Sequence, residues 1–114
     1  MAEIKQLQDA VDYIEHNITE DLTSSEIAKQ ACMSTFHFQR LFSILCGYTV
    51  GEYIRNRRFL LSATELQVSE KSIIDIAFRY GYDTPEGFTR VFHRYFGITP
   101  SAARDRKTVL PKFE

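Results

Sequence analysis

Apolar residues recur along most of the chain at the spacing of one face of an α-helix. The first such set predicts an amphipathic helix and comprises Leu7, Val11, Ile14 and Ile18. A polar cluster then predicts a second helix over 24–31, with Thr23 as its N-cap and Glu26 placed for a capping box. No alternating apolar and polar run of strand length stands out, so the pattern predicts an all-α fold.

Five more helices are predicted from capping residues and helix breakers. Ser34 and Ser72 are suited to N-cap positions, and Gly47 and Gly97 to the positions just after a helix. Pro85 suits the first position of a helix. The five predicted helices cover 35–46, 50–68, 73–80, 85–96 and about 100–107.

The sequence contains an internal repeat. A shift of 50 residues aligns Phe38 with Phe88, Arg40 with Arg90, Phe42 with Phe92, Gly47 with Gly97 and Thr49 with Thr99. Upstream the offset becomes 49 and places Ile27, Ala28 and Cys32 on Ile76, Ala77 and Gly81. One pair of helices repeated twice explains these matches economically.

Each copy has the pattern of a helix-turn-helix, in which a short helix is joined to a longer one by a tight turn. Ala28 and Ala77 are small enough for the two helices to cross closely. Four residues later Gly81 suits a turn that needs a positive φ. Cys32 departs from the pattern there, at a cost of about 1 kcal/mol if its backbone is left-handed. An ordinary helical hairpin is the alternative for one copy, and two copies with the same spacing favour DNA binding.

Length and composition agree with one cytoplasmic domain. The chain has 114 residues with no long apolar run, and its charged N-terminus is unlike a secretory signal. We expect both cysteines to be reduced, small residues of the core. Scattered histidines predict no metal site, and the sequence has no motif of an enzyme or of a cofactor site.

Charge alone argues weakly against nucleic acid, because the formal net charge is −1. Its distribution is more informative, since the acidic residues concentrate in 1–30. Four arginines and one acid occupy 34–60, and six basic residues and three acids occupy 79–107. Candidates for contacts with the DNA backbone are Arg55, Arg58, Arg94, Arg104 and Arg106.

Two long segments resemble the DNA-binding domain of AraC/XylS-type transcription regulators. They read LTSSEIAKQACMSTFHFQRLFSILCGYTVGEYIRNRR and IIDIAFRYGYDTPEGFTRVFHRYFGITPSAAR, and the resemblance covers about 4–107. It implies a homeodomain-like domain over 1–107, with helix-turn-helix subdomains at 4–48 and 72–107 joined by a linker helix at 50–68. Such a linker is roughly 28 Å long, against about 34 Å between successive major-groove faces. One chain would then bind two successive major-groove segments of double-stranded DNA.

The resemblance also implies which side chains face DNA. They are Thr35, Phe36, Gln39, Arg40 and Ser43 on the first recognition helix, and Pro85, Glu86, Thr89, Arg90, His93 and Arg94 on the second. Gln39 suits adenine, Arg40 suits guanine and Phe36 suits a thymine methyl group. The alternatives are a core position for Phe36, and a phosphate contact or surface ion pair for Arg40. Glu86 suits cytosine N4 but is repelled by phosphates, so the second helix also fits a role in positioning the protein on the DNA backbone.

In size the chain is similar to the small stand-alone activators of the family, which implies transcription activation at the nucleoid with RNA polymerase as a candidate partner. Its second motif is closer to members with a C-terminal effector-binding domain. Residues 108–114 fit the start of such a domain, so a small-molecule effector would bind outside this chain. The alternative is a protein-interaction module with little affinity for DNA, for which the acidic first helix is a candidate docking face.

Overall fold

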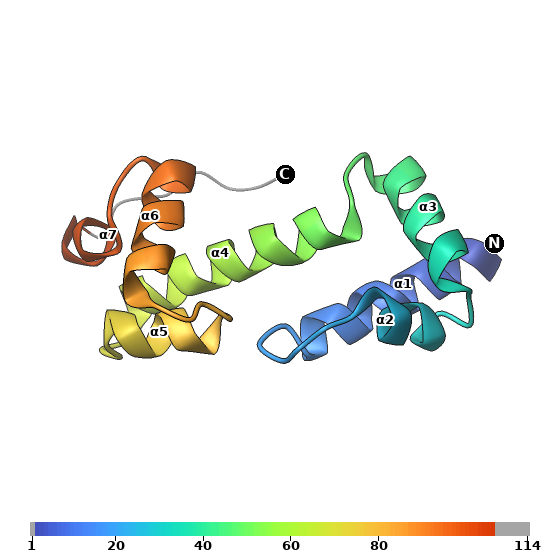
Figure 1. Ribbon diagram of the computed structural model, residues 1–114, viewed down its shortest axis with the longest axis horizontal. Coiled ribbons are helices and arrows are strands. Elements are labelled where there is room, and N and C mark those ends of the chain that lie inside the picture. Colours follow the sequence, from blue (N-terminus) through green and yellow to red (C-terminus); the bar gives the residue numbers. More distant parts are fainter. Residues whose placement is uncertain (1, 107–114) are drawn as a thin grey trace. The chain divides into compact units, whose positions relative to one another are not determined.

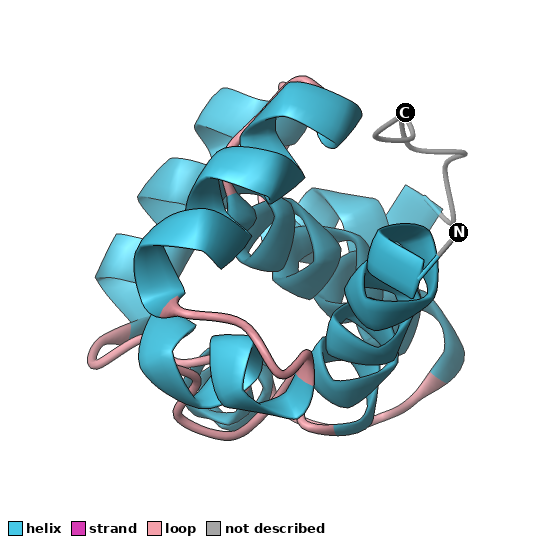
Figure 2. Ribbon diagram, turned by 90° about the vertical axis from the view of Figure 1, so that its right-hand side faces the viewer, coloured by secondary structure: helices cyan, strands magenta, loops and turns pink. Residues whose placement is uncertain are grey.

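The computed structural model describes residues 2–106, and for Ala2 and Arg106 it describes the backbone alone. Within that range the chain forms helices and loops without a strand, as Figure 2 shows. The seven helices, labelled in Figure 1, are α1 (Ala2–His16), α2 (Ser24–Gln30), α3 (Thr35–Cys46), α4 (Val50–Val68), α5 (Ile73–Arg79), α6 (Pro85–Phe96) and α7 (Pro100–Arg106). The predicted all-α fold is confirmed.

Most helix boundaries agree with the prediction from the sequence. Helices α3, α4 and α6 begin and end where predicted, whereas α2 and α5 are one residue shorter because Ala31 and Tyr80 are their C-caps. The first helix ends at His16, so Ile18 is buried beyond its end and not on its face. Lys107, predicted at the end of the last helix, lies outside the described residues, as does the segment 108–114.

The chain divides inside α4, between Arg55 and Asn56, into two compact units. In the first unit α2 packs against both α1 and α3. The core of this unit is apolar and consists of Leu7, Ala10, Ile14, Ile18, Ile27, Ala28, Ala31, Phe38, Phe42 and Val50. Ala10 is fully buried, whereas Val11, expected on the buried face, is only half-buried.

In the second unit α6 packs against both α5 and α7. Its core contains Phe59, Ala63, Leu66, Ile76, Ala77, Tyr80, Phe88, Phe92, Phe96 and Ala103. The Tyr80 hydroxyl donates a 2.9 Å hydrogen bond to Glu65, whose carboxylate also lies 3.4 Å from Nε of Arg79. Burial, and then the bond to Glu65, raise the pKa of Tyr80. This cluster ties the end of α5 to α4.

The predicted caps Thr23, Ser34 and Ser72 are present, and Thr84 forms the equivalent cap of α6. Thr23 and Ser72 accept hydrogen bonds from the third amide of α2 and α5, at 3.2 and 3.0 Å. Ser34 and Thr84 do the same for α3 and α6, at 3.2 and 3.0 Å. These equivalent bonds satisfy amides that the first turn of a helix leaves without a partner. The two halves therefore begin their helices in the same way.

The turn inside each unit is also the same. Cys32 has φ 57° and Gly81 has φ 93°, so both are left-handed. In the first copy Cys32 N donates to Lys29 O and Met33 N donates to Ala28 O, both at 3.0 Å. The second copy repeats both bonds, which together form a Schellman motif. The predicted positive φ is thus confirmed at both positions.

One prediction about the cysteines was wrong. Cys32 is exposed in the turn and Cys46 is half-buried on α3, so neither is a fully buried core residue. Partial burial raises the pKa of the Cys46 thiol. Cys32 is exposed because it occupies the left-handed position of the turn. That position requires a backbone conformation and does not require a buried side chain.

Candidate nucleic-acid interface

Helix α3 presents its polar residues opposite two buried aromatic rings. Phe38 and Phe42 are almost completely buried and fix the helix on the core of the first unit. Their spacing of four residues places the intervening side chains on the other face. The structure leaves Phe36, Gln39 and Arg40 exposed there, while Thr35 and Ser43 are half-buried.

The exposure of Phe36 settles the choice between a core role and a surface role. Its side chain is 72% exposed, so the alternative in which it belongs to the core is wrong. Arg40, one turn further along, has no ion pair with any residue from 2 to 106, and this removes the surface ion pair as an account of it. The outer face of α3 therefore combines an apolar ring, an amide and a free guanidinium.

Helix α3 also exposes two apolar residues that the sequence analysis did not single out. Ile44 is 66% exposed and Leu45 is 53% exposed. Helical spacing places Ile44 on the same stripe as Phe36 and Arg40. Helical periodicity assigns apolar residues to the buried face of an amphipathic helix, so it did not predict that Ile44 and Leu45 would be exposed.

Helix α6 repeats the arrangement of α3 with a more charged outer face. Phe88, Phe92 and Phe96 are buried and anchor the helix in the second core. Of the residues expected to face DNA, four are exposed, namely Glu86, Arg90, His93 and Arg94, and two are half-buried, namely Pro85 and Thr89. Each set of predicted residues thus lies on the single helix to which the sequence assigned it.

The repeat makes the two outer faces directly comparable. Shifted by 50 residues, the exposed Arg40 matches the exposed Arg90. Other exposed positions differ, most strongly where Phe36 in α3 is matched by Glu86 in α6. The two helices therefore share an outward arginine but present different chemistry around it.

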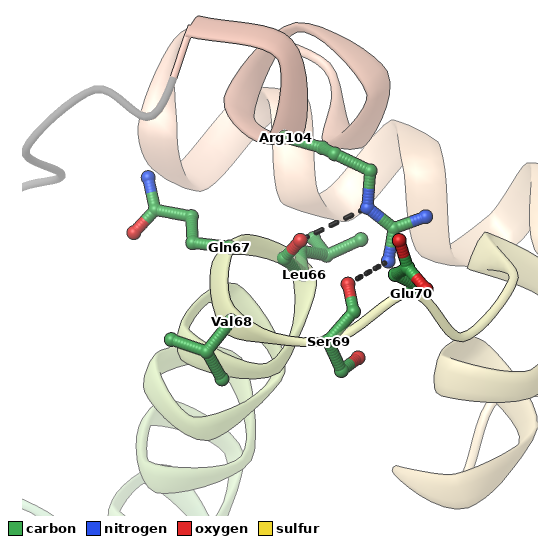
Figure 3. Close-up of a pocket in the computed structure, with 6 residues that line it drawn as sticks. All are labelled: Leu66, Gln67, Val68, Ser69, Glu70 and Arg104. Carbon is green, nitrogen blue, oxygen red and sulfur yellow. Dashed lines mark hydrogen bonds between the residues drawn. The ribbon is translucent and has the colours of Figure 1, made fainter.

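Several basic residues of the second unit have structural partners. The Arg104 side chain, shown in Figure 3, donates to the carbonyls of Leu66 at 2.9 Å, Ser69 at 3.4 Å and Lys71 at 2.5 Å. It caps the C-terminus of α4, where carbonyls lack helical partners. Arg104 was expected to contact DNA phosphates, and its position inside this cap argues against that role.

The pocket in Figure 3 lies beside this cap. It is lined by Leu66, Gln67, Val68, Ser69, Glu70 and Arg104. Arg79 and Lys71 both pair with Glu65, at 3.4 and 3.7 Å, and Arg57 and Arg58 also interact with other residues. Among the described lysine and arginine side chains of the second unit, those without such an interaction are Arg90 and Arg94 on α6.

The described part of the chain contains neither a candidate metal site nor a candidate membrane span. Among residues 2–106, no three His, Cys, Asp or Glu side chains gather in a group that would hold a metal ion. In the same range no helix combines the length and the apolar character needed to cross a bilayer.

Comparison with known proteins identifies similar sequences. A family model described as a helix-turn-helix domain matches residues 27–106. Regulatory protein SoxS of Escherichia coli K12 is 41% identical over 106 residues, which cover 93% of this chain and 99% of SoxS. The similarity therefore extends over nearly the whole length of both proteins.

Solved structures with the same fold include one that holds DNA. A transcriptional regulator from Chromobacterium violaceum, described as an AraC-type DNA-binding domain, has a TM-score of 0.83 at 29% identity; 91% of this chain and 93% of that chain are covered. The DNA-binding domain of the transcription factor AdpA, solved in complex with a target DNA, has a TM-score of 0.78 at 27% identity. That match covers 88% of this chain and 90% of the AdpA domain.

Proposed function

The chain belongs to the AraC/XylS family of helix-turn-helix DNA-binding transcription regulators, and we propose that it recognises a specific duplex through α3 and α6 as two recognition helices. Its relatives and its fold are those of transcription regulators and not of enzymes. The observation that carries the proposal is the matched pair Arg40 and Arg90. Each is exposed on the second helix of its helix-turn-helix, above buried phenylalanines that fix that helix.

The outer face of α3 suits direct recognition of bases in the major groove. The Arg40 guanidinium can donate two hydrogen bonds to O6 and N7 of guanine, and the Gln39 amide can pair with N6 and N7 of adenine. Phe36 offers its exposed ring to the methyl group of thymine. All three side chains are free of the core, so base contact does not require α3 to move.

The outer face of α6 suits contacts with the DNA backbone as well as with bases. Arg90 and Arg94 are exposed cations, and His93 lies between them in sequence. In the first turn Thr84 accepts from the amides of Gly87 and Phe88, and Pro85 has no N–H, so the amide of Glu86 is the one left for a phosphate oxygen. Together these groups would hold the second unit on the duplex.

One chain would bind an asymmetric site. Helix α4 is continuous over 19 residues, roughly 28 Å, and joins the two units. Because the recognition helices differ, two successive major-groove segments need not be palindromic. The AdpA domain, solved with a target DNA, supports duplex DNA as the partner.

The regulatory setting is part of the same proposal. Similarity to the regulatory protein SoxS over nearly its full length supports a role in transcription regulation. We further propose that the chain is an activator that works at the nucleoid in the cytoplasm, with RNA polymerase as a second partner. Control by a small molecule would require an effector-binding domain after residue 107. Adding RNA polymerase to a DNA-bound chain, and measuring transcription from the selected site, tests activation.

Selection of duplexes from a random pool by the purified chain at two salt concentrations tests the DNA-binding proposal. We expect an asymmetric site about two helical turns long, bound less tightly at high salt because phosphate contacts release counterions. Arg40→Ala should weaken binding at least tenfold. Lys5→Ala is the matched control, since it removes one exposed cation of α1 that only pairs with Asp9. Its affinity should stay within about twofold of the unmodified chain.

A protein-interaction module is the second candidate function. The net charge of −1 and the exposed Ile44 and Leu45 favour it, because phosphate binding uses neither. It predicts no site selection and no salt-sensitive binding to any duplex. An Arg40→Ala variant that binds every duplex as well as the unmodified chain would favour this candidate over DNA recognition.

A further inference from the structure

The repeat places two chemically opposed side chains at the same point of the two recognition helices. Phe36 in α3 and Glu86 in α6 are 50 residues apart, each lies in the first turn of its helix, and each is exposed. Four residues later both helices carry an exposed arginine, Arg40 and Arg90. If α3 and α6 both lie against DNA, as proposed above, these two first-turn positions approach the major groove in the same way.

A carboxylate at such a position is unfavourable unless it finds a hydrogen-bond donor. Arg90 lies one turn away, yet no ion pair joins it to Glu86 within the described structure. None of the described residues forms an ion pair with Glu86, and its charge would be repelled by the DNA phosphates. In the major groove, the hydrogen-bond donors that suit a carboxylate are amino groups of the bases.

Of the four bases, cytosine fits a carboxylate best. Guanine presents two acceptors, N7 and O6, and thymine presents the acceptor O4, so all three atoms repel Glu86. Adenine offers the donor N6 but places the acceptor N7 beside it. Cytosine presents the donor N4 without a neighbouring acceptor on the same base.

We propose that Glu86 specifies a cytosine in the segment bound by α6, and that the contrast with Phe36 fixes the orientation of the chain on its site. This inference rests on the proposed DNA-binding function. The segment bound by α3 would then be marked by a thymine methyl group, and the segment bound by α6 by a cytosine. A reversed chain would place the carboxylate against the methyl group and the ring against the amino group, and would lose both contacts.

Duplex selection with three variants tests the assignment. The unmodified chain should prefer cytosine about tenfold at one position of its site, within the range for one specific base contact. Glu86→Gln should move that preference to adenine, because the amide pairs with both N6 and N7. Glu86→Ala should abolish it, and Phe36→Ala should alter only the opposite segment. Thermal unfolding tests whether each variant still folds. We expect the Tm to stay close to that of the unmodified chain, because Phe36 and Glu86 are exposed.

The possible outcomes separate this inference from the proposed function. If both Glu86 variants bind all sequences more tightly with the same base preferences, Glu86 only repels phosphates; the inference fails while DNA recognition stands. Changes by Glu86 and Phe36 variants in one and the same segment would overturn the assignment of orientation. A chain that selects no site at all overturns the proposed function and the inference together.

Discussion

Replacing Cys32 with glycine should stabilise the first unit. Cys32 has φ 57° in the turn between α2 and α3, a conformation in which its Cβ crowds the backbone. Gly81 occupies the same position in the second unit at φ 93°, and glycine carries no such penalty. The chain thus contains both the strained and the relaxed form of one turn.

The magnitude follows from two opposing terms. A left-handed L-residue costs roughly 1–2 kcal/mol, and the middle of that range, about 1.5 kcal/mol, is used for Cys32 in place of the lower value of about 1 kcal/mol expected from the sequence. Glycine gives back about 0.7 kcal/mol, because it makes the unfolded chain more flexible. The net gain for Cys32→Gly is about 0.8 kcal/mol, which corresponds to an increase of roughly 4 °C in Tm for a small domain. Gly81→Ala reverses the change, since its new Cβ meets only Arg58 Nη1 at 3.5 Å and the penalty is mainly conformational.

Urea unfolding followed by circular dichroism measures these differences. Cys32→Ala is the control, because it removes the thiol but keeps the Cβ and therefore keeps the strain. The reasoning predicts that the glycine variant is more stable than both the unmodified chain and the alanine variant. Equal stability of the glycine and alanine variants would refute it, because the thiol and not the backbone would then be responsible.

Three further predictions concern single side chains. Arg104→Met should lower the free energy of unfolding by about 2 kcal/mol, because three backbone carbonyls at and just after the end of α4 lose their donor. Urea unfolding measures this change. The control is Arg94→Met at an exposed position, which should change the free energy of unfolding by less than about 0.5 kcal/mol. Phe36→Ala should leave the free energy of unfolding unchanged within about 0.5 kcal/mol, since the ring is exposed. Gel-shift titration should show that the variant binds the selected site about tenfold more weakly. An affinity equal to that of the unmodified chain would show that Phe36 does not contact DNA. The backbone amide of Thr49 lowers the pKa of Glu52 below its ordinary value of 4.5, so the stability from this bond is present at neutral pH and is lost as the pH falls from 4.5 through the lower folded value. Acid titration of stability should show a shallower loss in Glu52→Gln, and an unchanged slope would contradict this account.

Local rules of chain geometry account for the parts of the fold that could be predicted. N-cap residues, glycines after helices and a proline at a first position each act within one turn of the chain. The repeat then applied the same rules twice, and Thr23 and Ser72 are seen to form equivalent caps. The capping box of Thr49 and Glu52, with bonds of 2.8 and 3.1 Å, also follows such a rule, although the sequence analysis did not note it.

Contacts between distant parts of the sequence could not be predicted in this way. Arg104 contacts carbonyls 33 to 38 residues away, and nothing in its neighbourhood distinguishes it from Arg94. Arg79 likewise pairs with Glu65 across the α4–α5 connection. A basic segment in the sequence therefore overstated the positive charge available to DNA, because packing uses part of it.

The strongest evidence for function comes from repeated residues that folding does not require. Phe38 and Phe88 are both buried, and each unit needs an aromatic ring there to fill its core, so their identity is explained by packing alone. Arg40 and Arg90 are both exposed, and neither forms an ion pair with another described residue. No ion pair within the described structure explains an arginine at these two matched surface positions. The proposed contact of both helices with DNA would explain it, because guanine and phosphate favour a planar, doubly donating cation.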